Sequence, residues 1–217
     1  MASDLTTPTV TEMSIETLFQ SVSPILYQRL QGWGLYYYGF FSTKMNSIQA
    51  TNVAEIGAGY GTHARYNLDN CPDCSTYTLI DPMIYYTDDS FPIDVAQRTS
   101  SDQPNNFNFL YTMVSDSLQP YGSRVRWFRK SSQSVTDADV PQGSLDALFI
   151  DGNHSLVYED LQAFWPRLRS GGVIMGTEFQ QKRVSDAVQA FSDSTGFAYT
   201  IVTNSALNYQ LYQFVKP

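Results

Sequence analysis

The chain has 217 residues, and its 13 lysines and arginines against 21 aspartates and glutamates give a formal net charge of −8. A chain this acidic is not expected to bind nucleic acid or an anionic membrane surface as its main partner. Hydrophobic residues make up 42% of it, which is enough to bury a core and excludes a disordered composition. The longest apolar run, residues 35–41, is too short to span a bilayer.

The N-terminal part is predicted to form a helical segment that covers the substrate. Ser23-Pro24 is typical of a helix start, because proline suits the first helical position. The aromatic stretch 33–41 continues this segment, and its rings either pack in the core or form the wall of a substrate pocket. If exposed, they would allow a homodimer contact. We therefore divide the chain into a covering segment, residues 1–48, and a main domain, residues 49–217.

From residue 52 onward, short apolar strands alternate with helices. Strands are predicted over residues 52–56, 76–80, 124–129, 145–150, 173–175, 197–202 and 209–215, with helices through 64–68, 109–117, 161–168 and 184–191. Gly171-Gly172 is expected to end the third of these helices. Strands separated by helices predict a mostly parallel sheet with helices on both faces. Only residues 203–208 separate the last two strands, which is too few for a parallel crossover, so these strands should form an antiparallel hairpin.

Two cysteines, Cys71 and Cys74, have the C-x-x-C spacing of redox motifs and zinc half-sites. A redox pair usually sits where a strand opens into a helix, whereas this pair follows a helix and precedes a strand. We therefore expect a plain connecting loop. The acidic composition, the two reduced cysteines and the polar first ten residues together favour a cytoplasmic protein.

A glycine-rich segment, residues 55–61, follows the first strand with the sequence Glu-Ile-Gly-Ala-Gly-Tyr-Gly. Glycines between a strand and a helix let a ligand approach the backbone, and the helix N-terminus offers free N–H groups. The dinucleotide fingerprint requires its third glycine where Thr62 stands, so a nicotinamide or flavin site matches poorly. Asp81 ends the second strand, where an acid can accept hydrogen bonds from ribose hydroxyls, although it could equally be a turn residue before Pro82.

Four segments together resemble the class I S-adenosylmethionine-dependent methyltransferases, over roughly residues 50 to 217. They are Glu55 to Gly61, Leu79-Ile-Asp81, Leu145 to His154 and Leu168 to Gly176. The stretch Phe149 to Ser155 is most similar to the subgroup that includes O-methyltransferases of macrolide sugars and relatives of cephalosporin hydroxylase. The resemblance implies an α/β, Rossmann-like methyltransferase fold whose seven-stranded, mostly parallel sheet ends in an antiparallel C-terminal hairpin.

The same resemblance implies S-adenosyl-L-methionine as cofactor and a small molecule as the methyl acceptor, with a hydroxyl as the favoured group. Two alternatives remain open. The chain could transfer a methyl or aminopropyl group to an amine, or it could be a non-catalytic protein that retains the fold. The loop from Met83 to Pro104, with Tyr85, Tyr86 and Phe91, should help to cover the substrate.

By position in the family motif, Gly57, Ala58 and Gly59 would line the amino-acid end of the cofactor. Glu55 would support both the loop and the cofactor's ammonium group, and Asp81 would hold the ribose. Asp151, after the fourth strand, is a further cofactor-binding candidate. Family members place an acid followed by a small polar residue after the third strand, where the acid contacts the adenine.

Here that place reads Ser131-Ser132, so the adenine contact would depend on hydroxyl groups. A serine hydroxyl can accept a hydrogen bond from an exocyclic amine, but it does so without charge.

Asp151 and His154 are the main catalytic candidates, because both follow the fourth strand at the edge where the methyl group should point. Transfer to oxygen requires a hydroxyl that loses its proton, and a neutral imidazole is a suitable base near pH 7. His154 could instead be a helix-start residue bonded to the backbone. His63, beside the glycine loop, is expected on the surface of its helix rather than in catalysis.

A metal ion is a further option that the resemblance raises. Magnesium-binding members of the subgroup use the first aspartate after the fourth strand and an acid pair after the fifth. In this chain Asp151 and Glu178 could hold a divalent cation such as Mg²⁺ with waters in the remaining positions. Asn153 and Thr177 stand where acids are common in the subgroup, which weakens such a site.

Overall fold

The computed structural model describes residues 37–84, 103–204 and 209–217. The helix start at Ser23-Pro24 and the aromatics Tyr85, Tyr86 and Phe91 lie outside these ranges. The division of the chain at residue 48 stays a prediction. Within the described ranges, no helix is both long enough and apolar enough to cross a membrane.

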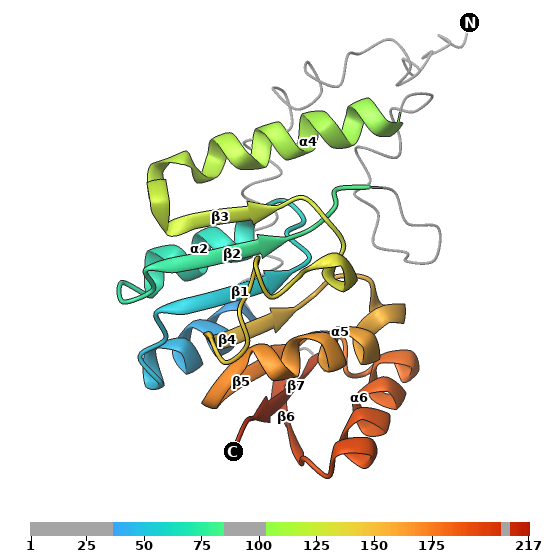
Figure 1. Ribbon diagram of the computed structural model, residues 1–217. Coiled ribbons are helices and arrows are strands. Elements are labelled where there is room, and N and C mark those ends of the chain that lie inside the picture. Colours follow the sequence, from blue (N-terminus) through green and yellow to red (C-terminus); the bar gives the residue numbers. More distant parts are fainter. Residues whose placement is uncertain (1–36, 85–102, 205–208) are drawn as a thin grey trace, which may run out of the picture.

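Seven strands form one sheet in the order β3-β2-β1-β4-β5-β7-β6 (Figure 1). They are β1 (Asn52–Ile56), β2 (Thr76–Ile80), β3 (Val125–Phe128), β4 (Leu145–Ile150), β5 (Leu168–Gly176), β6 (Tyr199–Asn204) and β7 (Tyr209–Val215). Strands β1 to β5 are parallel, whereas β7 pairs antiparallel with both β5 and β6. The predicted fold class and its closing hairpin are therefore confirmed.

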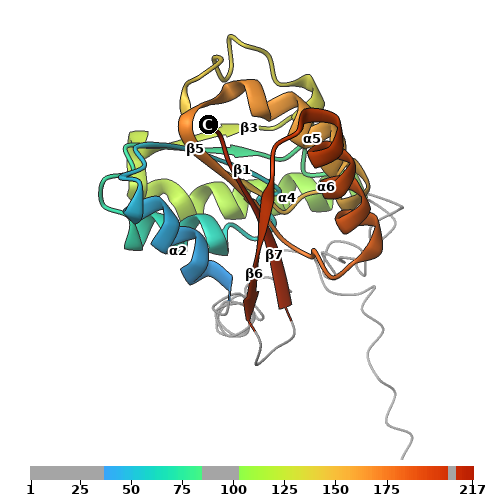
Figure 2. The same cartoon turned by 90° about the horizontal axis from the view of Figure 1, so that it is seen from below.

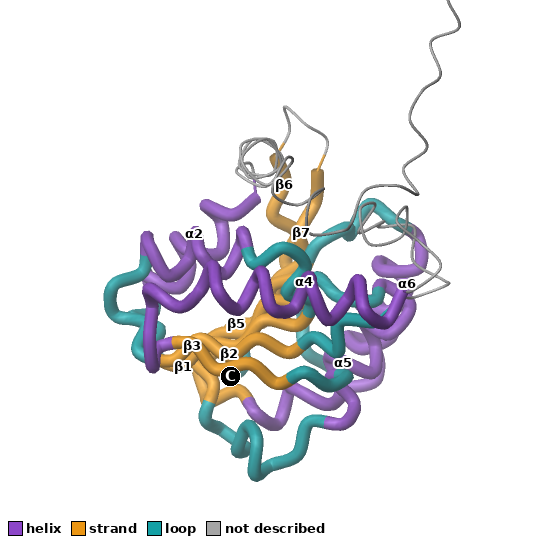
Figure 3. Tube along the Cα trace, turned by 90° about the horizontal axis from the view of Figure 1, so that it is seen from above, coloured by secondary structure: helices purple, strands orange, loops and turns teal. Residues whose placement is uncertain are grey.

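Helices cover both faces of this sheet. One face carries α2 (Thr62–Asn70), α4 (Gln103–Leu118) and a helical segment over residues 37–47, and the other carries α5 (Val157–Phe164) and α6 (Lys182–Thr195) (Figures 2 and 3). Short 3₁₀ helices are η2 (Gln119–Arg124), η3 (Ser132–Ser134), η4 (His154–Leu156) and η5 (Trp165–Arg167). The connection from β3 to β4 contains only η3, which packs against α5.

The side chains of β1 point alternately to the two faces of the sheet, and each face has its own cluster of buried residues. Val53 packs under α2 and α4, while Ala54 and Ile56 pack under α5 and α6, because successive side chains of a strand point to opposite faces. All residues of β4 are buried, as expected for a central strand covered on both faces. The apolar runs in the sequence therefore mark the centre of the sheet.

The helix predicted through residues 161–168 ends earlier than expected. It stops at Phe164, and η5 follows with Pro166 in its first turn, where the missing N–H of proline is tolerated. Leu168 already begins β5, so Gly171-Gly172 lies inside this strand and does not end the helix. The strand is irregular there, because the pairing of β4 with β5 shifts register between Leu145 and Ala147.

The aromatic residues at the end of the covering segment are core residues. Tyr38 and Phe41 are 6% and 0% exposed, so of the two alternatives given for this stretch these two rings follow the first and pack in the core. Residues 33–36 lie outside the described ranges. The homodimer contact stays a prediction without support from these residues.

Cys71 and Cys74 are free and buried in the connection between α2 and β2, as predicted from the order of the elements. Burial raises the thiol pKa of Cys71 to about 11 and that of Cys74 to about 12. Thiols in this state are poor nucleophiles at neutral pH, which agrees with a structural connection.

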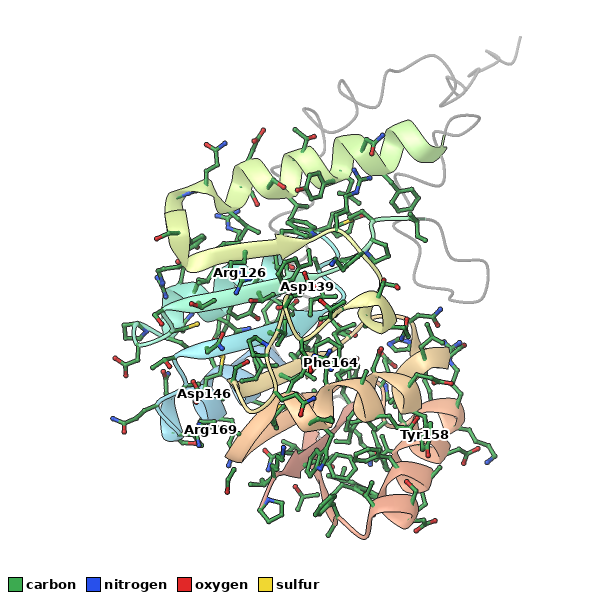
Figure 4. The ribbon with its side chains drawn as sticks, viewed as in Figure 1. Arg126, Asp139, Asp146, Tyr158, Phe164 and Arg169 are labelled. Carbon is green, nitrogen blue, oxygen red and sulfur yellow. The ribbon has the colours of Figure 1, made fainter. Side chains whose placement is uncertain are left out.

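Asp146 connects the amino-terminal ends of the central strands. Its carboxylate accepts hydrogen bonds from the backbone N–H groups of Thr51 and Asn52, at 2.7 and 2.8 Å, and pairs with Arg169 of β5. Figure 4 shows Asp146 and Arg169 side by side at the amino ends of β4 and β5. This carboxylate therefore joins the starts of three neighbouring strands.

Candidate active site

The strand order reverses between β1 and β4, and ligands of open α/β sheets bind at the carboxyl ends of the strands at such a point. The glycine loop follows β1 there, Asp81 follows β2 and Asp151 follows β4. The N–H of Gly57 donates to Ile80 O at 3.0 Å. A Cβ at Gly57, whose φ is +91°, would collide with the carbonyl oxygen of Asp151. Only glycine allows these segments to approach so closely.

Asp81 is bonded to the glycine loop. Its Oδ2 accepts hydrogen bonds from the N–H groups of Ala58 (2.8 Å) and Gly59 (3.4 Å), and its Oδ1 accepts one from Met83 (2.7 Å). Burial raises the pKa of this carboxyl group above its usual value, and the three backbone donors oppose that effect. Among the residues that the structure describes, a Cβ built at Gly59 meets no atom within 4 Å, so they leave the space beside this glycine open. A loop with accessible backbone beside an acid fits a ligand that carries hydroxyl groups.

Glu55 and His63 form a buried pair beneath this loop. The carboxylate of Glu55, 2% exposed, accepts a hydrogen bond from Tyr77 and lies 3.2 Å from His63 Nδ1. The expectation that His63 lies on the helix surface is wrong, because this residue is 5% exposed and its ring packs 4.1 Å from the ring of Phe149. The first turn of α2 faces the sheet, which brings His63 over β1 and β4. The predicted contact of Glu55 with the cofactor's ammonium group stays a prediction.

Asp151 and His154 are brought together as the sequence suggested. His154 Nε2 lies 3.7 Å from Asp151 Oδ1, and the same oxygen accepts a hydrogen bond from the hydroxyl of Thr177. The two side chains differ in access, since Asp151 is 27% exposed and His154 is 10% exposed. Both ring nitrogens of His154 are shielded from solvent. Asp151 is therefore the member of this pair that a ligand can reach.

Tyr37 completes the surroundings of Asp151, and it was not singled out from the sequence. Its hydroxyl donates to Asp151 Oδ2 at 3.1 Å. Its ring is nearly parallel to those of Phe149 and Tyr209, with centroids 6.1 and 5.4 Å away. The aromatic stretch was visible in the sequence, but no spacing rule connects Tyr37 with a residue 114 positions later.

Ser131 and Ser132 lie in the loop after β3. The Ser131 hydroxyl pairs with that of Ser134 at 2.6 Å, while Ser132 donates to Asp160 Oδ1 of α5 at 2.5 Å. Gln133 donates to the same oxygen at 2.8 Å. Burial raises the pKa of Asp160, which is 1% exposed, to about 7. Asp160 was missed in the sequence because it looks like one acid of a helical first turn. The adenine contact of the two serines stays a prediction.

The two predicted metal ligands, Asp151 and Glu178, each accept hydrogen bonds from different side chains of the protein. Both oxygens of Asp151 accept hydrogen bonds from protein hydroxyls, and Glu178 Oε2 accepts them from Gln180 (2.7 Å) and Gln181 (2.9 Å). In the described residues, no three or more histidine, cysteine, aspartate or glutamate side chains gather where they could hold a metal ion. A magnesium site at Asp151 and Glu178 stays a prediction.

Comparison with known families settles the class of the protein. A family model described as a methyltransferase domain matches residues 54–178, from β1 to just beyond β5. The chain belongs to this methyltransferase family. The predicted class I S-adenosylmethionine-dependent methyltransferase is thereby confirmed, and with it the prediction of an enzyme that uses this cofactor. The narrower subgroup of macrolide-sugar enzymes stays a prediction.

Solved structures share the fold at low sequence identity. The O-methyltransferase TomG from Streptomyces achromogenes, involved in tomaymycin synthesis and solved with SAM, is 14% identical with a TM-score of 0.60, covering 83% of this chain and 79% of its own. An O-methyltransferase from Bacillus cereus in complex with SAH is 14% identical with a TM-score of 0.56, covering 94% and 100%. The SAH-bound Podospora anserina methyltransferase PaMTH1 is 11% identical with a TM-score of 0.56, covering 83% and 77%. No curated protein matches the sequence.

Proposed function

We propose that this methyltransferase methylates a hydroxyl group of a small molecule, with Asp151 as the group that contacts the acceptor. The observation that carries the proposal is the position of the Asp151 carboxylate. It is partly exposed at the carboxyl end of β4, and its backbone touches the glycine loop. The O-methyltransferases among the structural neighbours support a hydroxyl acceptor.

The residues around the loop fit the cofactor. Gly57, Ala58 and Gly59 would hold its amino-acid end, since the backbone at Gly59 is open. Asp81 would hold the ribose, because its Oδ1, which accepts one hydrogen bond from the N–H of Met83, has a second lone pair for a ribose hydroxyl. When bound, S-adenosylmethionine supplies an electrophilic methyl group.

The proton of the acceptor hydroxyl must leave as its oxygen forms the new bond to carbon. Asp151 is the accessible base, and it would accept this proton directly from the acceptor oxygen. His154 lies behind it, with Nε2 3.7 Å from Oδ1, so the pair can share the proton and the charge. In this assignment, Asp151 contacts the acceptor and His154 is its buried partner. The proton leaves the pair for solvent after turnover.

The test is an acceptor screen that measures S-adenosylhomocysteine formed from S-adenosylmethionine. The panel contains phenols, catechols and sugars, with primary amines in parallel because an exposed carboxylate also attracts ammonium groups. With the best acceptor, Asp151→Asn should lower turnover by about 10²- to 10⁴-fold. His154→Ala should also lower it, while both variants keep their affinity for S-adenosylhomocysteine. Turnover of Asp151→Asn at the parent rate would refute the assignment, and methylation of amines alone would refute the hydroxyl acceptor.

The metal question is tested in the same assay. The parent and the Glu178→Gln variant are compared after treatment with EDTA and after addition of Mg²⁺. A required ion at Asp151 and Glu178 would make the parent inactive in EDTA and would weaken the response of the variant to Mg²⁺.

A further inference from the structure

The N-terminal helical segment contributes a side chain to the active site. We infer that Tyr37 is a positioning residue that fixes the orientation of the Asp151 carboxylate for the reaction. The inference rests on the proposed function, because it gives Tyr37 a role in catalysis only if Asp151 has one. Tyr37 lies before residues 54–178, which the family model matches.

The two oxygens of Asp151 accept hydrogen bonds from side chains in two distant parts of the chain. Tyr37 donates to Oδ2 from the helical segment 37–47, and Thr177 donates to Oδ1 from the end of β5. Rotation of the carboxylate would break at least one of these bonds. With both bonds in place, Oδ1 stays beside His154 Nε2, at 3.7 Å. Tyr37 and Thr177 therefore decide which oxygen faces the histidine and which side remains open.

The ring of Tyr37 is itself held in place by the sheet. It stacks on Phe149, two residues before Asp151 in β4, at an interplanar angle of 7°. It also stacks on Tyr209, at the start of β7, at an angle of 14°. Burial raises the pKa of Tyr37 well above its ordinary value, so the hydroxyl keeps its proton and remains a donor. A donor fixed in this way can orient a carboxylate without moving during turnover.

The neighbouring Tyr38 provides a matched control. It is a buried tyrosine of the same helical segment, but its hydroxyl pairs with Thr62 Oγ1 at 2.7 Å. Replacing either tyrosine by phenylalanine removes one phenolic hydroxyl and keeps the ring. Tyr38→Phe keeps the hydrogen bond from Tyr37 to Asp151, although it also removes a hydroxyl that interacts with Tyr37.

The experiment is a double-mutant cycle on turnover, with labelled methyl groups so that slow rates can be measured. Tyr37→Phe should lower kcat by about tenfold and leave the acceptor KM and the affinity for S-adenosylhomocysteine within about twofold. In the Asp151→Asn background, the same substitution should change kcat by less than about twofold, because the positioned group is gone. Tyr38→Phe should show much weaker coupling to Asp151→Asn than Tyr37→Phe does, because its hydroxyl pairs with Thr62 and makes no hydrogen bond to Asp151.

The outcomes distinguish a failure of the role of Tyr37 from a failure of the proposed function. Parent-like kcat of Tyr37→Phe, or an equal tenfold loss in the Asp151→Asn background, would overturn the role of Tyr37 while leaving the proposed function intact. Parent-like turnover of Asp151→Asn would overturn the proposed function itself. A cycle of Tyr37→Phe with Asp151→Ala, which removes both carboxylate acceptors, can be measured on urea unfolding without an acceptor substrate. Additive changes in the free energy of unfolding would show that the hydrogen bond is not made, which also overturns the inference.

Discussion

The buried carboxyl group of Asp160 should make the free energy of unfolding depend on pH. The carboxyl group is buried in α5, and its Oδ1 accepts hydrogen bonds from Ser132 and Gln133. Burial raises its pKa from 3.8 to about 7, and the negative charge of nearby Glu159 adds to this effect. The folded protein therefore binds a proton that the unfolded chain has already lost between these two pH values. The free energy of unfolding should fall as pH rises from about 4 to 7 and then level off.

The magnitude follows from the interval between the two pKa values. A difference of one in pKa corresponds to about 1.4 kcal/mol, so the full interval is worth about 4 kcal/mol as an upper value. Asp160→Asn cannot ionise, and its amide oxygen can still accept the hydrogen bonds from Ser132 and Gln133. The variant should match the parent near pH 4 and become more stable than the parent above pH 7. Its advantage there should be about 2 to 4 kcal/mol, because the substituted group does not reproduce every contact.

Urea unfolding monitored by tryptophan fluorescence between pH 4.5 and 8.5 provides the measurement. The matched control is Glu159→Gln, which removes a neighbouring exposed carboxylate from the same helix. This control should keep most of the pH dependence of the parent, because burial is the main cause of the raised pKa of Asp160 and the charge of Glu159 is a smaller one. Curves of the parent and Asp160→Asn that stay parallel over the whole range would refute the reasoning, since they would show that Asp160 is ionised in the folded protein at low pH.

Two further predictions concern the glycine loop and the opposite end of the sheet. Gly57→Ala should destabilise the protein by more than about 3 kcal/mol in thermal unfolding, because its Cβ would collide with Asp151 O. Gly59→Ala should fold with a loss of only about 1 to 2 kcal/mol, because its φ of +48° is unfavourable but its surroundings are open. A smaller loss for Gly57→Ala than for Gly59→Ala would contradict the packing described here. Asp146→Ala should cost about 3 kcal/mol, since it removes the acceptor of the Thr51 and Asn52 N–H groups and the partner of Arg169. Calorimetry should show unchanged binding of S-adenosylhomocysteine to Asp146→Ala. A large loss of affinity would contradict the position of Asp146 at the end of the sheet away from the glycine loop.

Features that depend on local sequence were predictable. The strands β1, β2 and β4 have the predicted bounds because each is a short apolar run between turn residues. The antiparallel hairpin followed from the short connection before Tyr209. The glycine loop and Asp81 also meet as predicted, because both follow parallel strands whose carboxyl ends share one edge of the sheet.

Features that depend on contacts between distant segments were not predictable. Tyr37 reaches Asp151 and Ser132 reaches Asp160 only once the sheet has brought the segments together. His63 was placed on the surface because a polar residue in a first helical turn usually faces water. Its burial depends on a partner, Glu55, whose side chain points to the same face of the sheet.

Binding of the cofactor product tests the central claim most directly, because every role described above depends on a methyltransferase site at the glycine loop. Isothermal titration of the protein with S-adenosylhomocysteine, in EDTA and again with Mg²⁺, should give a Kd on the order of micromolar in both conditions. The Asp81→Asn variant should bind at least about tenfold more weakly, because its amide replaces a carboxylate acceptor beside Ala58 and Gly59. An absence of binding to the parent in both conditions, or equal affinity of the parent and Asp81→Asn, would contradict the site.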